Sequence, residues 1–185
     1  MRVIAGNARG IKLDTIEGMA TRPTTDRVKE ALFSMIHNEL YDTVVLDLFS
    51  GSGSLGIEAA SRGAGKVTLV ENSKKCIEII KKNVQKTKLS GKIEVVQQEA
   101  ERYLALQSAT ECYDFIFMDP PYLKGFIEPL LETIDEKKLL AFDGKVIIEH
   151  DMKDVLQEAY GELLLDKKKK YGKTAVSVYR RNQND

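Results

Sequence analysis

The chain has 185 residues, a length typical of a single domain of about 100–200 residues. Hydrophobic residues make up 43% and charged residues 30%, which excludes a disordered or fibrous chain. The 28 basic and 28 acidic residues balance, and the two cysteines are too few for a disulfide scaffold and lack metal-ligand spacing. No apolar run approaches the ~18 residues that span a bilayer. We therefore expect a cytoplasmic protein without a metal ion or a membrane partner.

The first 42 residues are predicted to form a small N-terminal extension. Short extended pieces are expected at residues 2–5 and 11–14, broken by glycines. A helix is predicted after Pro23, because apolar residues recur there at helical spacing: Val28, Ala31, Leu32, Met35 and Ile36. Residues 1–13 contain three basic residues and no acid, and residues 167–181 contain seven basic residues. From charge alone a solvated surface is the simpler interpretation, and an anionic partner such as nucleic acid is the alternative.

Residues 43–185 alternate short apolar runs with helical patterns. Strands are expected at 44–48, 67–70, 93–96, 115–118, 146–149, 163–165 and 175–179. Helices are expected at 55–62, 74–87, 100–106, 127–139 and 153–159. Continuous apolar strands that alternate with helices predict an α/β fold with a mostly parallel sheet covered on both faces. Ligands of such sheets bind outside the carboxyl ends of the strands, where the strand order reverses.

A glycine-rich segment follows the first predicted strand. Gly51, Gly53 and Gly56 match G-x-G-x-x-G, and Glu71 ends the second strand, as in a dinucleotide-binding fingerprint. Asp47 favours a different ligand, because its carboxylate would repel a pyrophosphate and attract an ammonium group. S-adenosylmethionine carries an ammonium group and no phosphate, and Glu71 can accept hydrogen bonds from its ribose hydroxyls.

A third position follows the third predicted strand. Glu99 can accept a hydrogen bond from the adenine amino group, with Ala100 leaving room beside the ring. An exposed acid in the first turn of a helix explains Glu99 equally well, because the helix dipole favours negative charge there.

The fourth predicted strand runs into the sequence Asp119-Pro120-Pro121-Tyr122. Two prolines fix an extended backbone and remove two amide donors. The Asp119 carboxylate and the Pro120 carbonyl then form a corner of acceptors that can hold both hydrogens of an exocyclic amino group. Such a corner aims the nitrogen lone pair at a methyl donor by positioning and electrostatics. Tyr122 can stack on the base, as aromatic residues do with unstacked nucleotides.

These motifs together resemble a class I S-adenosylmethionine-dependent methyltransferase that methylates amino groups. Residues 22–33, with residues 2–6 before them and Tyr171-Gly172-Lys173-Thr174 near the end, are similar to the RsmD family. This family contains bacterial 16S rRNA guanine-N2 methyltransferases, and the resemblance covers essentially the whole chain. It implies a Rossmann-like, seven-stranded, mostly parallel sheet with helices on both faces and its last strand antiparallel. The small extension, residues 1–42, would meet RNA, and residues 43–185 would form the methyltransferase domain.

The resemblance also implies an activity and a set of site residues. A monomer would methylate N2 of one guanine, G966 by convention, in 16S rRNA of the 30S subunit. S-adenosyl-L-methionine would be bound by Asp47, Phe49, Gly51, Gly53, Glu71, Asn72, Glu99 and Ala100. The catalytic residues would be Asp119, Pro120 and Tyr122. The RNA would be bound by Arg2, Arg9, Arg22, Arg27 and Lys173.

Several alternatives stay open at this point. An N6-adenine DNA methyltransferase shares the Asp119–Tyr122 corner, but such enzymes usually carry an added target-recognition region. A protein-glutamine methyltransferase usually has Asn where Asp119 stands. A nicotinamide-dependent oxidoreductase leaves the corner unexplained, and a non-catalytic RNA-binding module leaves both motifs unexplained. His37, His150 and Cys76 are expected to be structural, because none has a metal-ligating partner at a suitable spacing.

Overall fold

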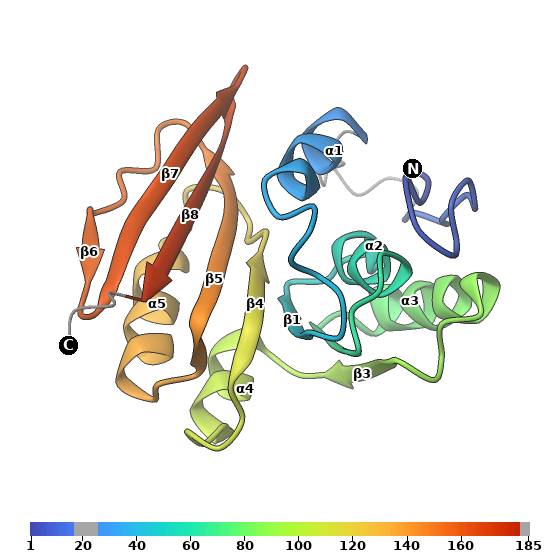
Figure 1. The fold of residues 1–185 in the computed structure, drawn as a ribbon, viewed down its shortest axis with the longest axis horizontal. Coiled ribbons are helices and arrows are strands. Elements are labelled where there is room, and N and C mark those ends of the chain that lie inside the picture. Colours follow the sequence, from blue (N-terminus) through green and yellow to red (C-terminus); the bar gives the residue numbers. More distant parts are fainter. Residues whose placement is uncertain (17–25, 182–185) are drawn as a thin grey trace.

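The computed structural model of the chain describes residues 1–16 and 26–181 (Figure 1). The helices in these ranges are α1 (Asp26–Ser34), α2 (Ser54–Ser61), α3 (Lys74–Thr87), α4 (Ala100–Leu106) and α5 (Ile127–Glu136). The strands are β1 (Val44–Leu48), β2 (Lys66–Glu71), β3 (Ile93–Gln97), β4 (Tyr113–Met118), β5 (Leu140–Asp151), β6 (Ala159–Tyr160), β7 (Leu163–Tyr171) and β8 (Thr174–Arg181). None of the helices in the described ranges has the length and apolar composition needed to cross a membrane.

The strands form one eight-stranded sheet in the order β3-β2-β1-β4-β5-β8-β7-β6. Strands β1 to β5 are parallel, and the remaining pairings are antiparallel. The predicted α/β class with an antiparallel strand at the end is confirmed. The prediction of seven strands was one short, because β6 has only two residues and pairs only with the beginning of β7. The strand order reverses between β1 and β4, which are neighbours in the sheet.

The helix predicted at residues 153–159 is absent, and a loop follows β5 instead. Polar groups outside the segment satisfy its backbone. The Tyr179 hydroxyl donates to the Gln157 carbonyl at 2.6 Å, and the Gln157 N–H donates to the Tyr160 hydroxyl at 3.0 Å. The Asp151 carboxylate accepts from the Lys153 N–H at 2.8 Å. A helix of this length is marginal by itself, so these tertiary bonds determine the conformation.

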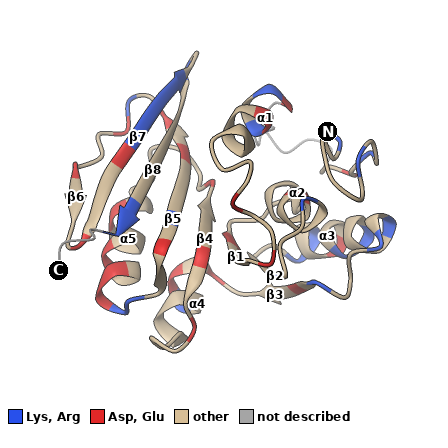
Figure 2. Cartoon of the chain, in the orientation of Figure 1, with Lys and Arg blue, Asp and Glu red and all other residues tan. Residues whose placement is uncertain are grey.

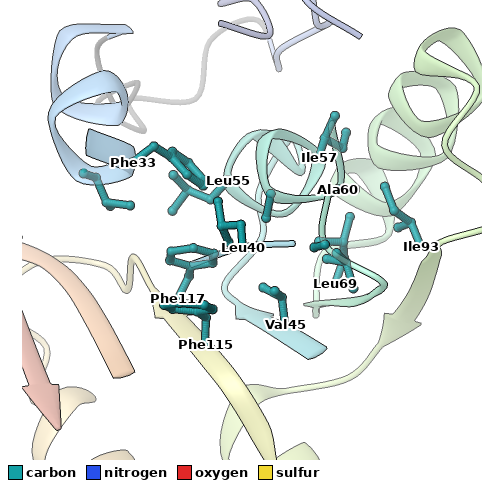
Figure 3. Packing of buried hydrophobic residues seen from close by; sticks show 14 of the residues in the cluster. Phe33, Leu40, Val45, Leu55, Ile57, Ala60, Leu69, Ile93, Phe115 and Phe117 are labelled. Carbon is teal, nitrogen blue, oxygen red and sulfur yellow. The ribbon is translucent and has the colours of Figure 1, made fainter. Parts of the chain in front are cut away.

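Two apolar clusters cover the two faces of the sheet. One face, called here the α1–α3 face, packs against Phe33 of α1, Ile57 of α2 and Ile80 of α3. The opposite α4–α5 face packs against Leu104 of α4 and Leu131 of α5. Figure 3 shows the α1–α3 face, where the ring of Phe33 lies 5.5 Å from that of Phe117 between centroids. The N-terminal segment, by which we mean residues 1–16, shares this core through Val3, Ala8 and Leu13. Residues of α1 and of the stretch that follows it are buried in the same cluster: Val28, Leu32, Ile36 and Leu40.

A buried carboxylate on α2 joins the N-terminal segment to the sheet. Glu58 is fully buried, and its carboxylate accepts from the backbone N–H groups of Ile4 at 2.9 Å and Ala5 at 3.0 Å. It also pairs with the Arg62 guanidinium at 2.8 Å and the Lys29 ammonium at 3.3 Å. Four donors thus satisfy one carboxylate in the interior, as a buried charge requires.

Lys29, on α1, extends this connection to two more segments. Its side chain is fully buried and donates to the Arg2 carbonyl at 2.6 Å and to the Ser54 hydroxyl at 3.1 Å. Arg2 lies in the first of the two extended pieces, which is bridged to the second through Lys12. Ser54 is the first residue of α2 and directly follows the glycine-rich segment.

We expect the Glu58→Gln substitution to lower the free energy of unfolding by about 3–5 kcal/mol, because it leaves the Lys29 ammonium buried without its counter-ion. Urea unfolding followed by circular dichroism measures this loss. Glu94→Gln is the matched control, since it breaks the Lys66–Glu94 pair, whose side chains are 64% and 60% exposed and whose charged atoms lie 4.0 Å apart. Equal unfolding midpoints for the two variants would contradict the role given to Glu58.

Candidate active site

Three loops with predicted functional residues begin at one level of the sheet. Leu48, the last residue of β1, pairs with Val70 of β2 on one side and with Met118 of β4 on the other. The glycine-rich loop, Glu71 and the Asp119–Tyr122 corner therefore leave the same edge of the sheet, beside the reversal in strand order. This is where α/β sheets bind their ligands.

The glycine-rich loop has a left-handed backbone at three positions, with φ of 63° at Phe49, 56° at Gly51 and 82° at Gly53. A Cβ atom at Gly51 would meet nothing within 4 Å, so its backbone borders open space. Phe49 adopts this conformation at a cost, because side chains disfavour positive φ. Its ring is held by Phe126, with centroids 5.6 Å apart. Gly56 serves packing instead, since a Cβ there would lie 2.1 Å from the Leu69 side chain.

Glu71 fixes the loops on both sides of it. One carboxylate oxygen accepts from the Gly51 N–H at 2.9 Å, and the other accepts from the Ser73 N–H at 2.9 Å. The sequence did not reveal this bracing role. An ionised carboxylate has about four acceptor positions, so the half-buried Glu71 retains acceptor capacity for ligand hydroxyls.

Asn83 of α3 holds the glycine-rich loop from another side. Its side-chain amide donates to the Ser52 carbonyl at 2.9 Å and to the Asp14 carbonyl at 3.0 Å, and its oxygen accepts from the Asp14 N–H at 2.8 Å. The residue is fully buried. The conformation of the loop therefore depends on the N-terminal segment as well as on its own glycines.

Asp47 is the most unusual group of the site. It is 1% exposed; one carboxylate oxygen accepts from the Gly56 N–H at 3.0 Å, and the other has no hydrogen-bond partner among the described residues. Burial raises the pKa of Asp47 to about 7, against the effect of the Gly56 hydrogen bond, and the nearby Glu71 charge adds to the rise. An unsatisfied buried oxygen is destabilising. This oxygen fits a cationic ligand group such as the ammonium of S-adenosylmethionine.

An open pocket of about 500 Å³ adjoins the ends of β2 and β3, and it is lined by Asn72, Gln97, Gln98, Glu99 and Arg102. Glu99 precedes α4 and makes no capping hydrogen bond with its exposed side chain, while Ala100 is buried. Two of the predicted cofactor residues, Asn72 and Glu99, thus border one pocket. Their contact with adenine stays a prediction.

The corner after β4 is supported from the far side of the site. Asp119 is half-buried and Pro120 is buried. The Tyr122 hydroxyl donates to the Glu149 carboxylate at 3.1 Å and is hydrogen-bonded to the Thr174 hydroxyl at 3.3 Å. Burial raises the pKa of Tyr122, so the phenol stays protonated. Both partners are buried, and they anchor the ring to β5 and β8.

Glu149 and Thr174 were not found from the sequence. The available signals are an acid at the end of an otherwise apolar strand and a threonine in the segment Tyr171-Gly172-Lys173-Thr174. His150, next to Glu149, is structural as predicted, since it is fully buried. Its Nδ1–H donates to the Asp151 carbonyl at 2.8 Å, and its Nε2 accepts from the Ser177 hydroxyl at 2.8 Å. Burial lowers the pKa of His150, which keeps the ring neutral.

The residues predicted to contact RNA are not gathered into one cluster. Arg2 and Arg9 are exposed in the N-terminal segment, Arg27 is exposed on α1, and Lys173 is exposed in the turn between β7 and β8. Figure 1 shows the β7–β8 turn and the N-terminal segment on different sides of α1. Arg22 lies outside the described residues. Within those residues no group of three or more His, Cys, Asp or Glu side chains is placed to hold a metal ion.

The sheet order, with the glycine-rich loop beside the reversal in strand order, is that of a class I methyltransferase fold. The family model described as Conserved hypothetical protein 95 matches residues 1–180. The chain belongs to this family, the RsmD family.

Individual relatives match over nearly their whole length. The chain is 41% identical over 182 residues to YlbH of Bacillus subtilis, covering 98% of this chain and 99% of that protein. It is 34% identical over 181 residues to Ribosomal RNA small subunit methyltransferase D of Escherichia coli, covering 98% and 90%. The solved structure of yhhF from Escherichia coli matches with a TM-score of 0.86 at 32% identity, covering 100% of this chain and 99% of that chain.

The raised pKa of Asp47 predicts a pH-dependent stability for the protein without ligand. Between about pH 4 and pH 7 the folded state binds a proton that the unfolded state has released, so stability falls as the pH rises through this window. Relative to Asp47→Asn, wild type should lose up to about 4 kcal/mol across it. Urea unfolding of both proteins at pH 4.5 and 7.5 measures the change. A pH-independent difference between them would show that Asp47 titrates normally.

Proposed function

We propose that this protein transfers a methyl group from S-adenosyl-L-methionine to the exocyclic N2 amino group of one guanine, G966 by convention, in 16S rRNA of the 30S subunit. The relative named Ribosomal RNA small subunit methyltransferase D, which matches 98% of this chain, supports the substrate class. The observation that carries the proposal is the acceptor corner of Asp119 and Pro120 beside the glycine-rich loop at one sheet edge. An acceptor corner next to a methyl donor is the arrangement that amino-group methylation needs.

The chain offers a matching residue for each part of the cofactor. The unpartnered oxygen of Asp47 would bind the ammonium group, the backbone at Phe49, Gly51 and Gly53 would border the amino-acid portion, and Glu71 would bind the ribose hydroxyls. The adenine would lie at the pocket that Asn72 and Glu99 border, with the buried Ala100 following Glu99 in the chain. When bound, S-adenosylmethionine supplies an electrophilic methyl group.

The chain's own residues position the target base. The Asp119 carboxylate and the Pro120 carbonyl hold the two amino hydrogens, which directs the nitrogen lone pair. The Tyr122 ring, fixed through its hydroxyl by Glu149 and Thr174, presents a flat face on which an unstacked base can lie. The Asp119 carboxylate accepts the proton that leaves the methylated nitrogen. The catalysis is chiefly positioning and electrostatic stabilisation.

The RNA side of the proposal rests on exposed basic residues. Arg2, Arg9 and Arg27 lie in residues 1–42, which we propose act as the RNA-contacting extension of the domain formed by residues 43–185. Arg22 belongs to the same segment of sequence, and Lys173 would add a contact from the β7–β8 turn. The protein would act as a monomer in the cytoplasm, on small subunits.

Transfer of labelled methyl groups tests the proposal. Purified protein is incubated with labelled S-adenosylmethionine and with unmodified 30S subunits, naked 16S rRNA or duplex DNA, and the labelled nucleoside is identified by chromatography. N2-methylguanosine at one position of 16S rRNA is the expected result. N6-methyladenine in DNA would establish the alternative adenine DNA methyltransferase, and binding of RNA without label transfer would establish a non-catalytic RNA-binding module.

The Asp119→Ala variant should lose at least about 100- to 1000-fold in methyl transfer, as enzymes do when an oriented electrostatic group is removed. Asp119→Asn keeps one side-chain acceptor and should retain an intermediate rate. Single-turnover transfer to the accepted RNA measures both rates. Binding of S-adenosylhomocysteine, followed by calorimetry, is the control for an intact cofactor site. Wild-type rates in a folded Asp119→Ala protein would remove Asp119 from the mechanism.

A further inference from the structure

Strand β7 carries a run of four exposed lysines, Lys167 to Lys170, which the proposed function leaves without a role. None of the four forms an ion pair with another described residue. The neighbouring acid, Asp166, is already paired with Arg180 at 3.0 Å. Figure 2 shows the run as the blue stretch of β7 in the hairpin with β8. The turn of this hairpin lies at the carboxyl end of β5, because Thr174 pairs with Asp151.

The register of the sheet divides the four lysines between two faces. Lys167 pairs with Val178 and Lys169 with Val176, and both valines are buried in the cluster of the α1–α3 face. Side chains of paired residues point to the same face, and successive residues alternate between faces. Lys167 and Lys169 therefore project from the α1–α3 face, whereas Lys168 and Lys170 project from the α4–α5 face.

The lysines of the α1–α3 face lie next to the corner that would hold the target base. Glu149 of β5, Val176 of β8 and Lys169 of β7 form one row across three strands. Neighbouring strands are about 4.8 Å apart, so the Cα atoms of Glu149 and Lys169 are separated by roughly 10 Å. The Glu149 carboxylate accepts the hydrogen bond that fixes Tyr122. A lysine side chain at position 169 thus borders the stacking surface.

We propose that Lys167 and Lys169 bind backbone phosphates of the RNA strand next to the target nucleotide, and that Lys168 and Lys170 do not. The identity of the ligand as RNA rests on the proposed function. A base that leaves its stack to enter a pocket brings its flanking phosphates to the rim of that pocket. Unpaired ammonium groups at the rim neutralise these phosphates and fix the orientation of the strand.

A different role would not distinguish the two faces. Strand β6 pairs with Leu163 and Leu164, and among the described residues no other strand pairs with the lysine stretch on that side, which leaves it at an edge of the sheet. Lysines on such an edge prevent pairing with another chain. Protection of the edge would use the charge of all four lysines. Phosphate binding near Tyr122 would use only the two lysines on the α1–α3 face of the sheet.

The test compares two double variants with the same change in charge. Lys167→Ala with Lys169→Ala removes the lysines of the α1–α3 face, and Lys168→Ala with Lys170→Ala is the matched control. The first should reduce the slope of log affinity against log salt by about 1.4, at about 0.7 per single-stranded phosphate contact. With equal affinities of variant and wild type at 1 M salt, this difference in slope gives roughly 25-fold weaker binding of unmodified 30S subunits by the variant at about 0.1 M salt. The control should change affinity by less than about threefold, as distant charges are screened.

Kinetics add a second readout. The variant of the α1–α3 face should raise KM for the subunits with little change in kcat, because the lost contacts are made equally in the ground state and the transition state. S-adenosylhomocysteine affinity and the urea midpoint should match wild type in both variants. Equal losses in the two double variants would overturn the proposal, because the affinity would then depend on the total charge of β7 and not on the face.

The outcome separates this proposal from the function on which it rests. If wild type transfers no methyl group to subunits, the proposed function fails. The two double variants are then compared for binding to a single-stranded RNA oligonucleotide, since phosphate contacts do not read sequence. A loss confined to the Lys167 and Lys169 variant on that RNA supports the proposal. Equal affinities of both variants for it overturn the proposal.

Discussion

The buried pairing of Glu58 with Lys29 is the constraint on which the arrangement of this protein depends. A charge in the interior is tolerated only with complete partners, and Glu58 obtains them from the N-terminal segment, from α1 and from its own helix. Lys29 in turn donates a hydrogen bond to the Ser54 hydroxyl, at the position where α2 begins after the glycine-rich loop. The segment that would contact RNA and the loop that would bind the cofactor are therefore parts of one polar network.

Asn83 provides the second connection between the same regions. Its amide group donates to the carbonyls of Asp14 and Ser52 at once, so the loop is held to α3 and, through it, to the N-terminal segment. Strained backbone persists only where its surroundings determine it, and the left-handed conformation of Phe49 lies within this support. A preorganised loop avoids the entropic cost of ordering the backbone when a ligand binds. The N-terminal segment thus contributes to the site by supporting the glycine-rich loop through Asp14.

The sequence predicts what depends on local pattern, and it misses what depends on distant partners. Apolar runs located part of every long strand, although β5 and β7 extend well beyond the predicted 146–149 and 163–165. The glycine and proline motifs located two loops that the sheet register then aligned at Leu48. Glu58, Asn83 and Glu149 look like ordinary polar residues, because each has a partner that lies 27 to 69 positions away in the chain. The prediction of a helix at 153–159 was wrong for the same reason, since the Tyr179 hydroxyl donates to the backbone carbonyl of Gln157.

Two buried carboxylates of this protein differ in how completely their oxygens are hydrogen-bonded. Glu58 has a partner for each oxygen, and its burial is a property of the fold alone. Asp47 is buried to a similar degree, yet one of its oxygens has no partner among the described residues, and its pKa is raised to about 7. A fold gains nothing from a charge left in this state, because an apolar or fully bonded residue would stabilise it more. The unpartnered oxygen of Asp47 is therefore the feature of the site that the fold alone does not explain, and this is the reason for assigning it to the cofactor's ammonium group in the proposed function.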